Sequence, residues 1–174
     1  KTDILQWLQV CENGEAAFFA DDYRAFRDAE GNAEPEVTAC DDDMLYIMYT
    51  SGTTGLPKGV VHTHHTAIWG LFSIAATANY NIPERFLACL PMFHVGALTP
   101  LAVNVYRGVT SVVMRSFDPV AAWKIIESEK ITSALCVPAM LNFMVQVPNF
   151  EDFDRSTLRW IMTGAAPVPV ALTQ

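Results

Sequence analysis

The sequence predicts an α/β fold, with a mostly parallel sheet and helices on both of its faces. From Met44 onward, apolar segments of strand length alternate with longer segments of helical length or spacing. Strands separated by helices are typically parallel, and the connecting helices then cover both faces of the sheet. The chain has 174 residues, of which 51% are hydrophobic, so it can form one domain with a sizeable core.

Composition and periodicity place the individual elements. The expected strands, rich in Val, Ile, Leu and aromatic residues, are 44–49, 85–90, 110–115, 132–137 and 158–163. The expected helices between them are 64–78, 95–105, 119–130 and 139–147. The third of these has Asp118 as its cap and Pro119 at its first position, which is the preferred order at a helix start.

The first part of the chain differs from the rest. Residues 1–43 read as a lead-in segment, with short helices expected over residues 3–10 and 21–29. Acidic residues and a Gly-Asn-Ala-Glu-Pro loop fill much of this segment. We therefore divide the sequence into a lead-in, residues 1–43, and a partial α/β domain, residues 44–174.

Charge and cysteine usage limit the function classes. The net charge of −8 argues against a nucleic-acid partner, because phosphate backbones require a basic surface. Cys11, Cys40, Cys89 and Cys136 are far apart, which favours free buried thiols over disulfides or a zinc site. Residues 1–10 do not have the pattern of a signal peptide, and no apolar stretch has the length of a membrane span. A cytoplasmic protein without an integral membrane segment is expected.

The most informative segment runs from Thr50 to Lys58. It combines hydroxyl side chains and two glycines with one lysine, directly after an apolar run of strand length that we interpret as a buried strand. Glycines let backbone N–H groups approach an anion, hydroxyl groups add further donors, and the lysine adds a positive charge. Such a set of groups suits a polyphosphate, so the first hypothesis is an enzyme that uses ATP.

The segment is not the P-loop of nucleoside triphosphatases. That signature, GxxxxGK[ST], counted from Gly52 requires glycine at position 57 and a hydroxyl residue after the lysine. Pro57 and Gly59 occupy these two positions. Proline has no N–H to offer a phosphate, and the hydroxyl ligand for magnesium is missing.

The run Tyr-Thr-Ser-Gly-Thr-Thr-Gly-Leu-Pro-Lys-Gly, residues 49–59, resembles the phosphate loop of the adenylate-forming superfamily. This superfamily of AMP-dependent synthetases and ligases includes acyl-CoA synthetases, luciferases and the adenylation domains of peptide synthetases. Three later segments are also similar to the family's motifs: Pro-Met-Phe-His-Val-Gly-Ala-Leu at 91–98, Val-Pro-Ala-Met at 137–140 and Thr-Gly-Ala-Ala-Pro at 163–167. The resemblance covers residues 40–174 and implies an internal part of the large N-terminal domain of an acyl-CoA synthetase.

The resemblance implies an activity and a set of site residues. A carboxylate would attack the α-phosphorus of ATP, pyrophosphate would leave, and CoA would capture the acyl-adenylate; ATP, Mg²⁺ and CoA are the implied cofactors, and a small-molecule carboxylic acid is the partner. The implied nucleotide-binding residues are Thr50, Ser51, Gly52, Thr53, Thr54, Gly55, Lys58, Gly164, Ala165, Ala166 and Pro167. The implied substrate-binding residues are Phe93, His94, Val95, Gly96 and Pro138, and Lys58 and His94 are the implied catalytic residues. Arg115 is a candidate contact for CoA phosphates or an ordinary surface arginine.

His94 bears on the class of acid. Amino-acid-activating members of the family usually carry an aspartate after the phenylalanine, where it pairs with the substrate ammonium. In this chain His94 follows Phe93, and the next residues are apolar. A buried ammonium would have no partner there, so a fatty, aryl or other non-amino acid is favoured. His94 lines the acyl pocket in this interpretation, whereas the alternative is a histidine that only fills space.

Other readings remain open at this level. His62, His64 and His65 could ligate zinc, but no further ligands complete such a site, so we expect no metal bound by this chain's side chains. The acceptor could be a carrier protein or an oxidative reaction instead of CoA, or the chain could be a nucleotide-binding module without catalysis. The family's later motifs and its mobile C-terminal domain are absent. We therefore expect an isolated piece of this kind to be inactive, and its exposed sheet edges make self-association possible.

Overall fold

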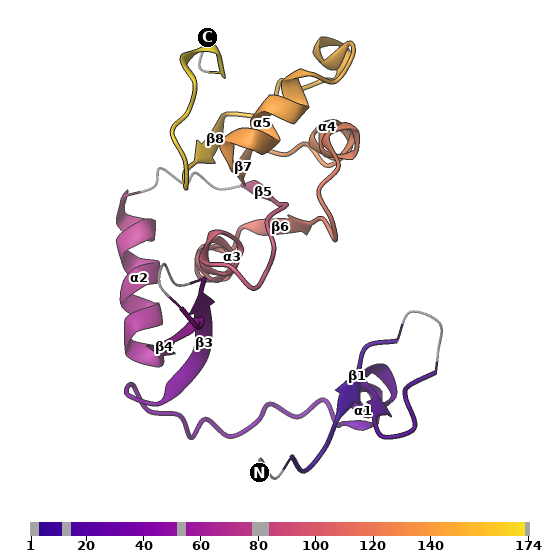
Figure 1. Ribbon diagram of the computed structural model, residues 1–174, viewed down its shortest axis with the longest axis vertical. Coiled ribbons are helices and arrows are strands. Elements are labelled where there is room, and N and C mark those ends of the chain that lie inside the picture. Colours follow the sequence, from indigo (N-terminus) through magenta and orange to yellow (C-terminus); the bar gives the residue numbers. More distant parts are fainter. Residues whose placement is uncertain (1–3, 12–14, 52–54, 78–83, 173–174) are drawn as a thin grey trace. The chain divides into compact units, whose positions relative to one another are not determined.

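The computed structural model describes residues 4–11, 15–51, 55–77 and 84–172, and within it the chain forms two compact units, Lys1–Ala39 and Cys40–Gln174 (Figure 1). In the first unit, β1 (Leu8–Gln9) pairs in parallel with β2 (Asp21–Asp22). The helix α1 (Tyr23–Ala29) follows directly. Its cap is the carboxylate of Asp22, which accepts hydrogen bonds from the second and third backbone N–H groups beyond it, at 2.7 and 3.1 Å.

The helix expected over residues 21–29 is thus present, although it begins two residues later. The helix expected over residues 3–10 is wrong. In the described part of that segment, the backbone N–H of Asp21 donates to the carbonyl of Trp7 at 2.9 Å, and Leu8–Gln9 is a strand. Residue 3, the expected cap, lies outside the described residues. A short helix has little stability of its own, so tertiary pairing decided the outcome here.

The second unit contains all the other elements (Figure 1). Its strands are β3 (Met44–Thr50), β4 (Lys58–Thr63), β5 (Arg85–Ala88), β6 (Thr110–Val113), β7 (Ser133–Cys136) and β8 (Trp160–Thr163). Its helices are α2 (His64–Thr77), α3 (Val95–Arg107), α4 (Pro119–Ser128) and α5 (Pro138–Val145), with short 3₁₀ turns η1 (Phe150–Asp152) and η2 (Val170–Leu172). The main strands and helices expected from the sequence are present, with ends that differ by at most two residues.

Four of these strands form a parallel sheet in the order β6-β5-β7-β8. Each parallel connection runs through a helix, which confirms the α/β class predicted from the sequence. Helix α4 begins as expected, because Asp118 accepts a hydrogen bond from the backbone N–H of Ala121 at 2.7 Å. In this arrangement, the carboxyl ends of all four strands lie along one edge of the sheet.

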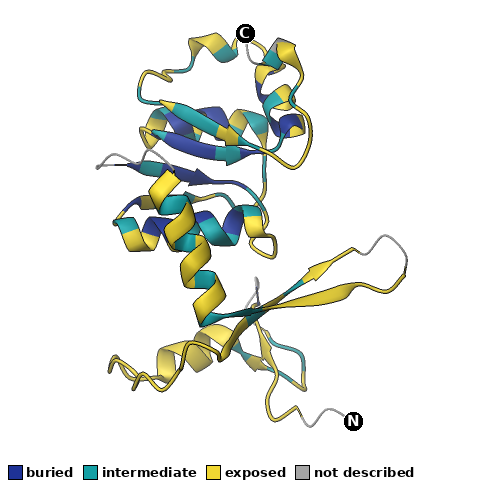
Figure 2. Ribbon diagram, turned by 90° about the vertical axis from the view of Figure 1, so that its left-hand side faces the viewer, coloured by how far each residue is buried: buried dark blue, intermediate teal, exposed yellow. Residues whose placement is uncertain are grey.

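Successive residues of β5 alternate between the two faces of this sheet and so divide the core into two parts. Leu87 and the neighbouring Cys89 pack against α4 and α5, in a cluster that includes Ile126. Phe86 and Ala88 pack on the other face, against α3. Figure 2 shows that the buried residues are concentrated in this sheet and its helices. Both faces are covered by helices, as the sequence predicted.

The hairpin formed by β3 and β4 is a correction to the expected sheet. The strand expected over residues 44–49 is present, but it pairs antiparallel with β4 in a separate two-stranded sheet, and β4 itself was missed. Strand β3 was also expected to be buried, yet most of its residues are exposed. An apolar run indicates a strand but does not reveal how many elements cover it.

Helix α2 is less buried than its apolar sequence suggests. It has no fully buried residue, and Trp69 is 60% exposed. Leu71, Ile74 and Ala75 pack partly against the α3 side of the core. Within the described ranges, no helix combines the length and the hydropathy that a bilayer span requires.

Candidate functional site

Three cavities lie around the first turn of α3, near the carboxyl edge of the four-stranded sheet. We name them by their position: the hairpin cavity, the sheet-edge cavity and the inner cavity. Their volumes are about 580, 490 and 300 Å³ respectively. The segment Phe93–His94–Val95 contributes to the first two, and Val95 contributes to all three. The start of α3 therefore joins the three spaces.

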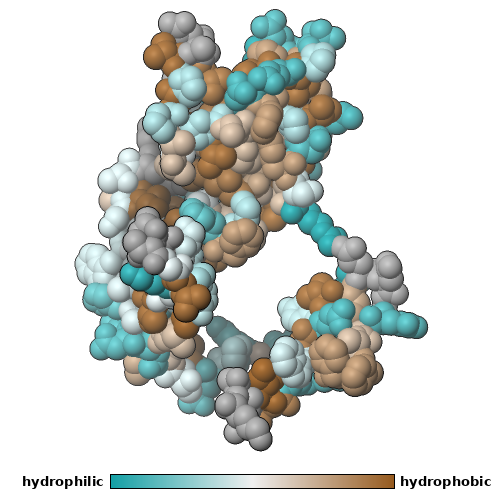
Figure 3. Space-filling view, viewed as in Figure 1, coloured by the Kyte–Doolittle hydropathy of each residue, from teal (hydrophilic) through white to brown (hydrophobic). Residues whose placement is uncertain are grey.

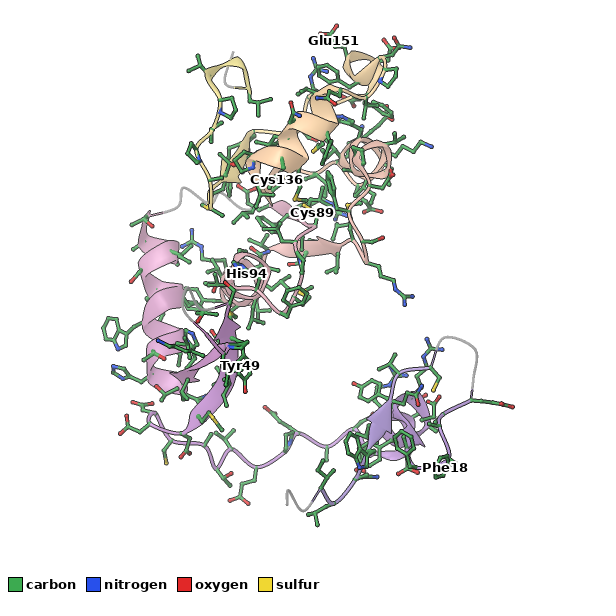
Figure 4. All side chains as sticks on the ribbon, in the orientation of Figure 1. Phe18, Tyr49, Cys89, His94, Cys136 and Glu151 are labelled. Atoms are coloured by element: carbon green, nitrogen blue, oxygen red, sulfur yellow. The ribbon has the colours of Figure 1, made fainter. Side chains whose placement is uncertain are left out.

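The hairpin cavity lies between the tip of the β3–β4 hairpin and the start of α3. Thr50 and Ser51 line it from the end of β3, and His62 lines it from β4. Tyr46 and His62 stack across the hairpin with their ring centroids 4.7 Å apart. In Figure 4 the label of His94 lies above that of Tyr49, which belongs to β3 of the hairpin. Hydroxyl groups and imidazole rings make this the more polar of the two larger cavities.

The hairpin tip is held by close cross-strand contacts. Thr50 and Lys58 are partners in the antiparallel register, and the Thr50 hydroxyl donates to the carbonyl oxygen of Lys58 at 3.4 Å. A Cβ atom on Gly59 would lie 2.9 Å from a methyl carbon of Ile47, so a larger residue would require the Ile47 side chain to shift.

The sheet-edge cavity is mainly apolar. Its walls come from the ends of β5, β7 and β8, the first turns of α3 and α5, and the segment after β8. The lining residues are Leu90, Pro91, Phe93, His94, Val95, Gly96, Leu135, Val137, Met140, Met162, Thr163, Gly164 and Ala165. Within the described part of the chain, His94 is the titratable side chain of this lining. In the space-filling view, hydrophobic residues gather over this part of the second unit, around α5 and β8 (Figure 3). A cavity of this kind suits an apolar group that ends in an anion or a dipole.

His94 is fixed by two backbone contacts. It is the N-cap of α3, and its Nδ1 accepts a hydrogen bond from the backbone N–H of Gly96 at 3.2 Å. Its own backbone N–H donates to the carbonyl of Pro91 at 3.1 Å. Because Nδ1 acts as an acceptor, the proton of the neutral ring is on Nε2. The ring can therefore offer one N–H donor to a ligand.

The inner cavity continues the apolar space beneath α3. It shares Val95, Gly96, Leu135 and Met162 with the sheet-edge cavity. A Cβ atom on Gly96 would lie 3.0 Å from Leu90 Cδ1, so a larger residue here would narrow the space between the two cavities. The two cavities together provide depth for an extended apolar chain.

The segment after β8 contains two unusual features. Ala165 has a positive φ of 68°, which L-residues other than Asn, Asp and His rarely adopt. Thr163 Oγ1 is buried and has no hydrogen-bond partner within the described part of the chain. Both residues line the sheet-edge cavity. Backbone strain and an unsatisfied hydroxyl group at the same wall are typical of binding sites.

The structure brings together about half of the residues expected from the sequence. Gly52, Thr53 and Thr54 lie outside the described residues. Thr50, Ser51, Phe93, His94, Val95, Gly96, Gly164 and Ala165 all line one or more of the cavities. The remaining described candidates line none of the three cavities. They are Gly55 and Lys58 at the hairpin, Arg115 in the loop before α4, Pro138 at the first position of α5, and Ala166 and Pro167 after β8.

Sequence reasoning missed several cavity residues. Met162 was not considered, and Leu90 and Leu135 were assigned only to strands. Met140 was named as part of the segment 137–140 and not as a site residue. Each of them lies at, or just beyond, the carboxyl end of a strand or in the first turn of a helix. Ligands of parallel sheets bind at this edge, so the register of the strand ends was the signal that could have found them.

The fold and the cavities define an α/β domain in which a hydroxyl-rich hairpin lies beside a deep apolar pocket. The chain belongs to the AMP-binding enzyme family, whose model matches residues 4–174. It is 48% identical over 139 residues to a long-chain-fatty-acid–CoA ligase, FadD13, of Mycobacterium tuberculosis. It is 34% identical over 146 residues to a feruloyl-CoA synthase of an Amycolatopsis species.

A solved structure extends this similarity to the fold. The inhibitor-bound N-terminal domain of FACL13 from Mycobacterium tuberculosis superposes with a TM-score of 0.82 and 45% identity, over 88% of this chain and 39% of that one. The two curated relatives are matched over 80% and 83% of this chain, but over only 28% and 30% of their own lengths. The sequence thus spans less than a third of the length of these two curated relatives.

Proposed function

We propose that this chain is part of a carboxylic acid–CoA ligase that activates an acid with ATP and transfers the acyl group to CoA. In this proposal the hairpin binds the ATP phosphates, and the sheet-edge cavity holds the acid. The observation that carries the proposal is that both cavities meet at Phe93–His94–Val95. The relatives named above are CoA ligases, which supports the same reaction class.

The hairpin residues would serve phosphate binding. Thr50 and Ser51 offer hydroxyl donors at the cavity wall, and Lys58 enters β4 across from Thr50. Gly52, Thr53, Thr54 and Gly55 lie between these residues in the sequence and complete the proposed set. An anionic acid must attack a polyanion, so donors and a cation are needed to offset the repulsion and to stabilise the departing pyrophosphate.

His94 would position the acid between the two spaces. Its Nε2–H can donate to the carboxylate of the acid, while the apolar part extends past Gly96 into the sheet-edge and inner cavities. A carboxylate oxygen then attacks the α-phosphorus of ATP, and the bond to pyrophosphate breaks. The sulfur of CoA next attacks the acyl carbonyl carbon, and AMP leaves with the electron pair of the broken bond.

The lining of the sheet-edge cavity favours a non-amino acid. Among the described residues that line it, none is a carboxylate, so a substrate ammonium would lose its hydration without gaining a partner there. Fatty and aryl acids fit this lining. Gly164, Ala165, Ala166 and Pro167 form the proposed wall for the adenine ring. Pro138 would support the acid pocket at the start of α5, and Arg115 is a proposed contact for the phosphates of CoA.

Mg²⁺ would accompany ATP as its counter-ion. Within the described residues, no cluster of three His, Cys, Asp or Glu side chains is present, so we assign no ligand for the ion in this chain. The metal would add positive charge at the phosphates. The chain's own part would be to orient those phosphates with the hairpin donors.

The proposal is tested by acid-dependent exchange of pyrophosphate into ATP, and by formation of an acyl-CoA thioester, in the complete protein. Lys58→Ala should lower the exchange rate by a factor on the order of 100 or more, because a cation at the phosphates is lost. Lys124→Ala, on the exposed face of α4, is the matched control and should leave the rate unchanged. Equal rates for the Lys58 variant and the unchanged protein would contradict the proposal, and adenylation without thioester formation would exclude CoA as the acceptor.

A further inference from the structure

Two buried cysteines lie side by side beneath the sheet-edge cavity. Cys136 is the last residue of β7, and Cys89 directly follows β5. Their sulfur atoms are 3.8 Å apart, and the two residues are 1% and 5% exposed. Figure 4 shows them as neighbours on the α5 side of the sheet. They have no role in the function proposed above.

The strand register explains why these two residues meet. Leu87 and Ala134 are partners in the parallel pair of β5 and β7, so the residues two positions further along both strands lie opposite each other. Neighbouring strands are about 4.8 Å apart, which is within the range of Cα separations found in disulfides. A short movement of the side chains would therefore bring the two sulfur atoms to bonding distance.

The local contacts favour Cys89 as the reactive thiol. The two thiols are in hydrogen-bond contact, and either sulfur can be the donor. This contact with Cys136 lowers the pKa of Cys89, although burial opposes the effect. The same contact, together with burial, raises the pKa of Cys136. Cys89 would thus attack first, and Cys136 would resolve the intermediate.

Both cysteines are followed directly by cavity residues. Leu90 and Pro91 come after Cys89, and Val137 comes after Cys136; all three line the sheet-edge cavity. Pro91 also accepts the hydrogen bond that holds the backbone of His94. A bond between the sulfur atoms would draw these two segments together, and the wall of the cavity would change with them.

We propose that Cys89 and Cys136 form a reversible disulfide that reshapes the sheet-edge cavity. With hydrogen peroxide as the oxidant, the Cys89 sulfur attacks one peroxide oxygen, the O–O bond breaks, and water leaves after protonation. The Cys136 sulfur then attacks the sulfenic sulfur of Cys89, and its thiol proton leaves with the hydroxyl group as a second water. Two thiols and one peroxide thus give one disulfide and two waters. The effect on acid binding rests on the function proposed above, whereas formation of the bond does not.

Peptide mapping of the 174-residue chain tests the bond itself. The chain is treated with limiting peroxide, remaining thiols are blocked with N-ethylmaleimide, and trypsin places the four cysteines in four separate peptides. The expected product links peptide 86–107 to peptide 131–155, and dithiothreitol separates them. Cys40→Ser removes the exposed thiol and should leave this product unchanged. Oxidation of Cys40 without a disulfide between peptides 86–107 and 131–155 would overturn the proposal. Because the unchanged chain is mapped, the result does not depend on whether a Cys89 variant folds.

Hydrogen exchange and ligand binding test the consequence. Amide exchange should differ between the reduced and oxidised chains at residues 90–97 and 137–141, and should be the same along α4. Affinity for decanoate should fall about tenfold on oxidation and recover after reduction. If neither the reduced nor the oxidised chain binds decanoate, the proposed function fails. The hydrogen-exchange result still decides whether the disulfide changes the cavity wall. Unchanged exchange at both segments in a fully oxidised sample would overturn the claim that the disulfide reshapes the cavity.

Discussion

At the scale of single residues, the sheet-edge cavity contains a backbone conformation and a buried hydroxyl group that each lower the stability of the fold. Ala165 adopts a left-handed backbone conformation at the wall of the sheet-edge cavity. The Thr163 hydroxyl group is buried nearby without a partner among the described residues. Such features persist where the surrounding structure enforces them, and they concentrate at binding sites. The cost of the left-handed residue can be measured directly.

Ala165→Gly should stabilise the chain. Relief of the left-handed conformation contributes about 1–2 kcal/mol, and the added freedom of glycine in the unfolded chain offsets about 0.4–1 kcal/mol of it. We expect a net gain of about 0.5–1 kcal/mol in the free energy of unfolding, measured with urea. Ala166→Gly is the matched control, because Ala166 is not among the residues with positive φ, and it should destabilise by about 0.4–1 kcal/mol. Loss of stability in both variants would contradict the assigned strain.

At the scale of elements, a buried carboxylate joins the amino ends of three strands. Glu84, which precedes β5, is 2% exposed and pairs with Arg159, which precedes β8. It also accepts hydrogen bonds from the hydroxyl groups of Thr132 and Ser133 at the start of β7. This network lies at the opposite edge of the sheet from the sheet-edge cavity, so we expect its role to be fixing the strand register.

Glu84→Gln should cost about 2 kcal/mol of unfolding free energy, because a charged acceptor for several donors becomes neutral. Glu129→Gln provides the control. Glu129 pairs with Arg85 at the surface, where a single ion pair contributes less than about 1 kcal/mol. Urea denaturation of the three proteins measures both effects. Equal destabilisation by the two substitutions would show that burial adds nothing to the Glu84 network.

At the scale of the whole molecule, stability should depend on pH through carboxylates that are stabilised in the folded state. The Lys130 ammonium donates to Asp154 at 2.7 Å, and together with hydrogen bonds from Ser156 it holds the pKa of Asp154 well below its usual range. A carboxyl group whose pKa is lowered by folding stabilises the fold above its unfolded pKa, about 3.9. That contribution is lost as the pH falls through the native pKa.

Asp154→Asn should therefore reduce stability at neutral pH and flatten its decline between about pH 4 and pH 2. The measurement is the urea midpoint across this range. Asp152→Asn, in the neighbouring turn η1, is the control for loss of one negative charge. An identical pH profile for the Asp154 variant and the unchanged chain would contradict the role of this ion pair.

Local patterns were sufficient to predict much of this fold. Strand-length apolar runs and the Asp118–Pro119 helix start gave the main elements and the α/β class, and the run at residues 49–59 indicated the family. The hairpin was missed because the antiparallel pairing of Lys58–Thr63 with β3 is a tertiary contact that a single strand-length pattern does not indicate. Cys89 and Cys136 are 47 positions apart, and their contact depends on the order of the strands in the sheet. The backbone conformation of Ala165 likewise depends on the residues that surround it. Such features follow from tertiary structure and leave little local signal.

The central claim is that the phosphate-binding and acid-binding spaces meet at His94. The most direct test is to follow the nuclear magnetic resonance signals of the His94 ring while the chain is titrated with decanoate and, separately, with Mg²⁺-ATP. The His94→Asn variant assigns these signals. Asparagine keeps an acceptor for the helix cap, so this variant should stay folded. We expect both ligands to shift the His94 ring resonances. Decanoate that shifts the methyl resonances of Met140 and Met162 but leaves His94 unchanged would contradict the claim.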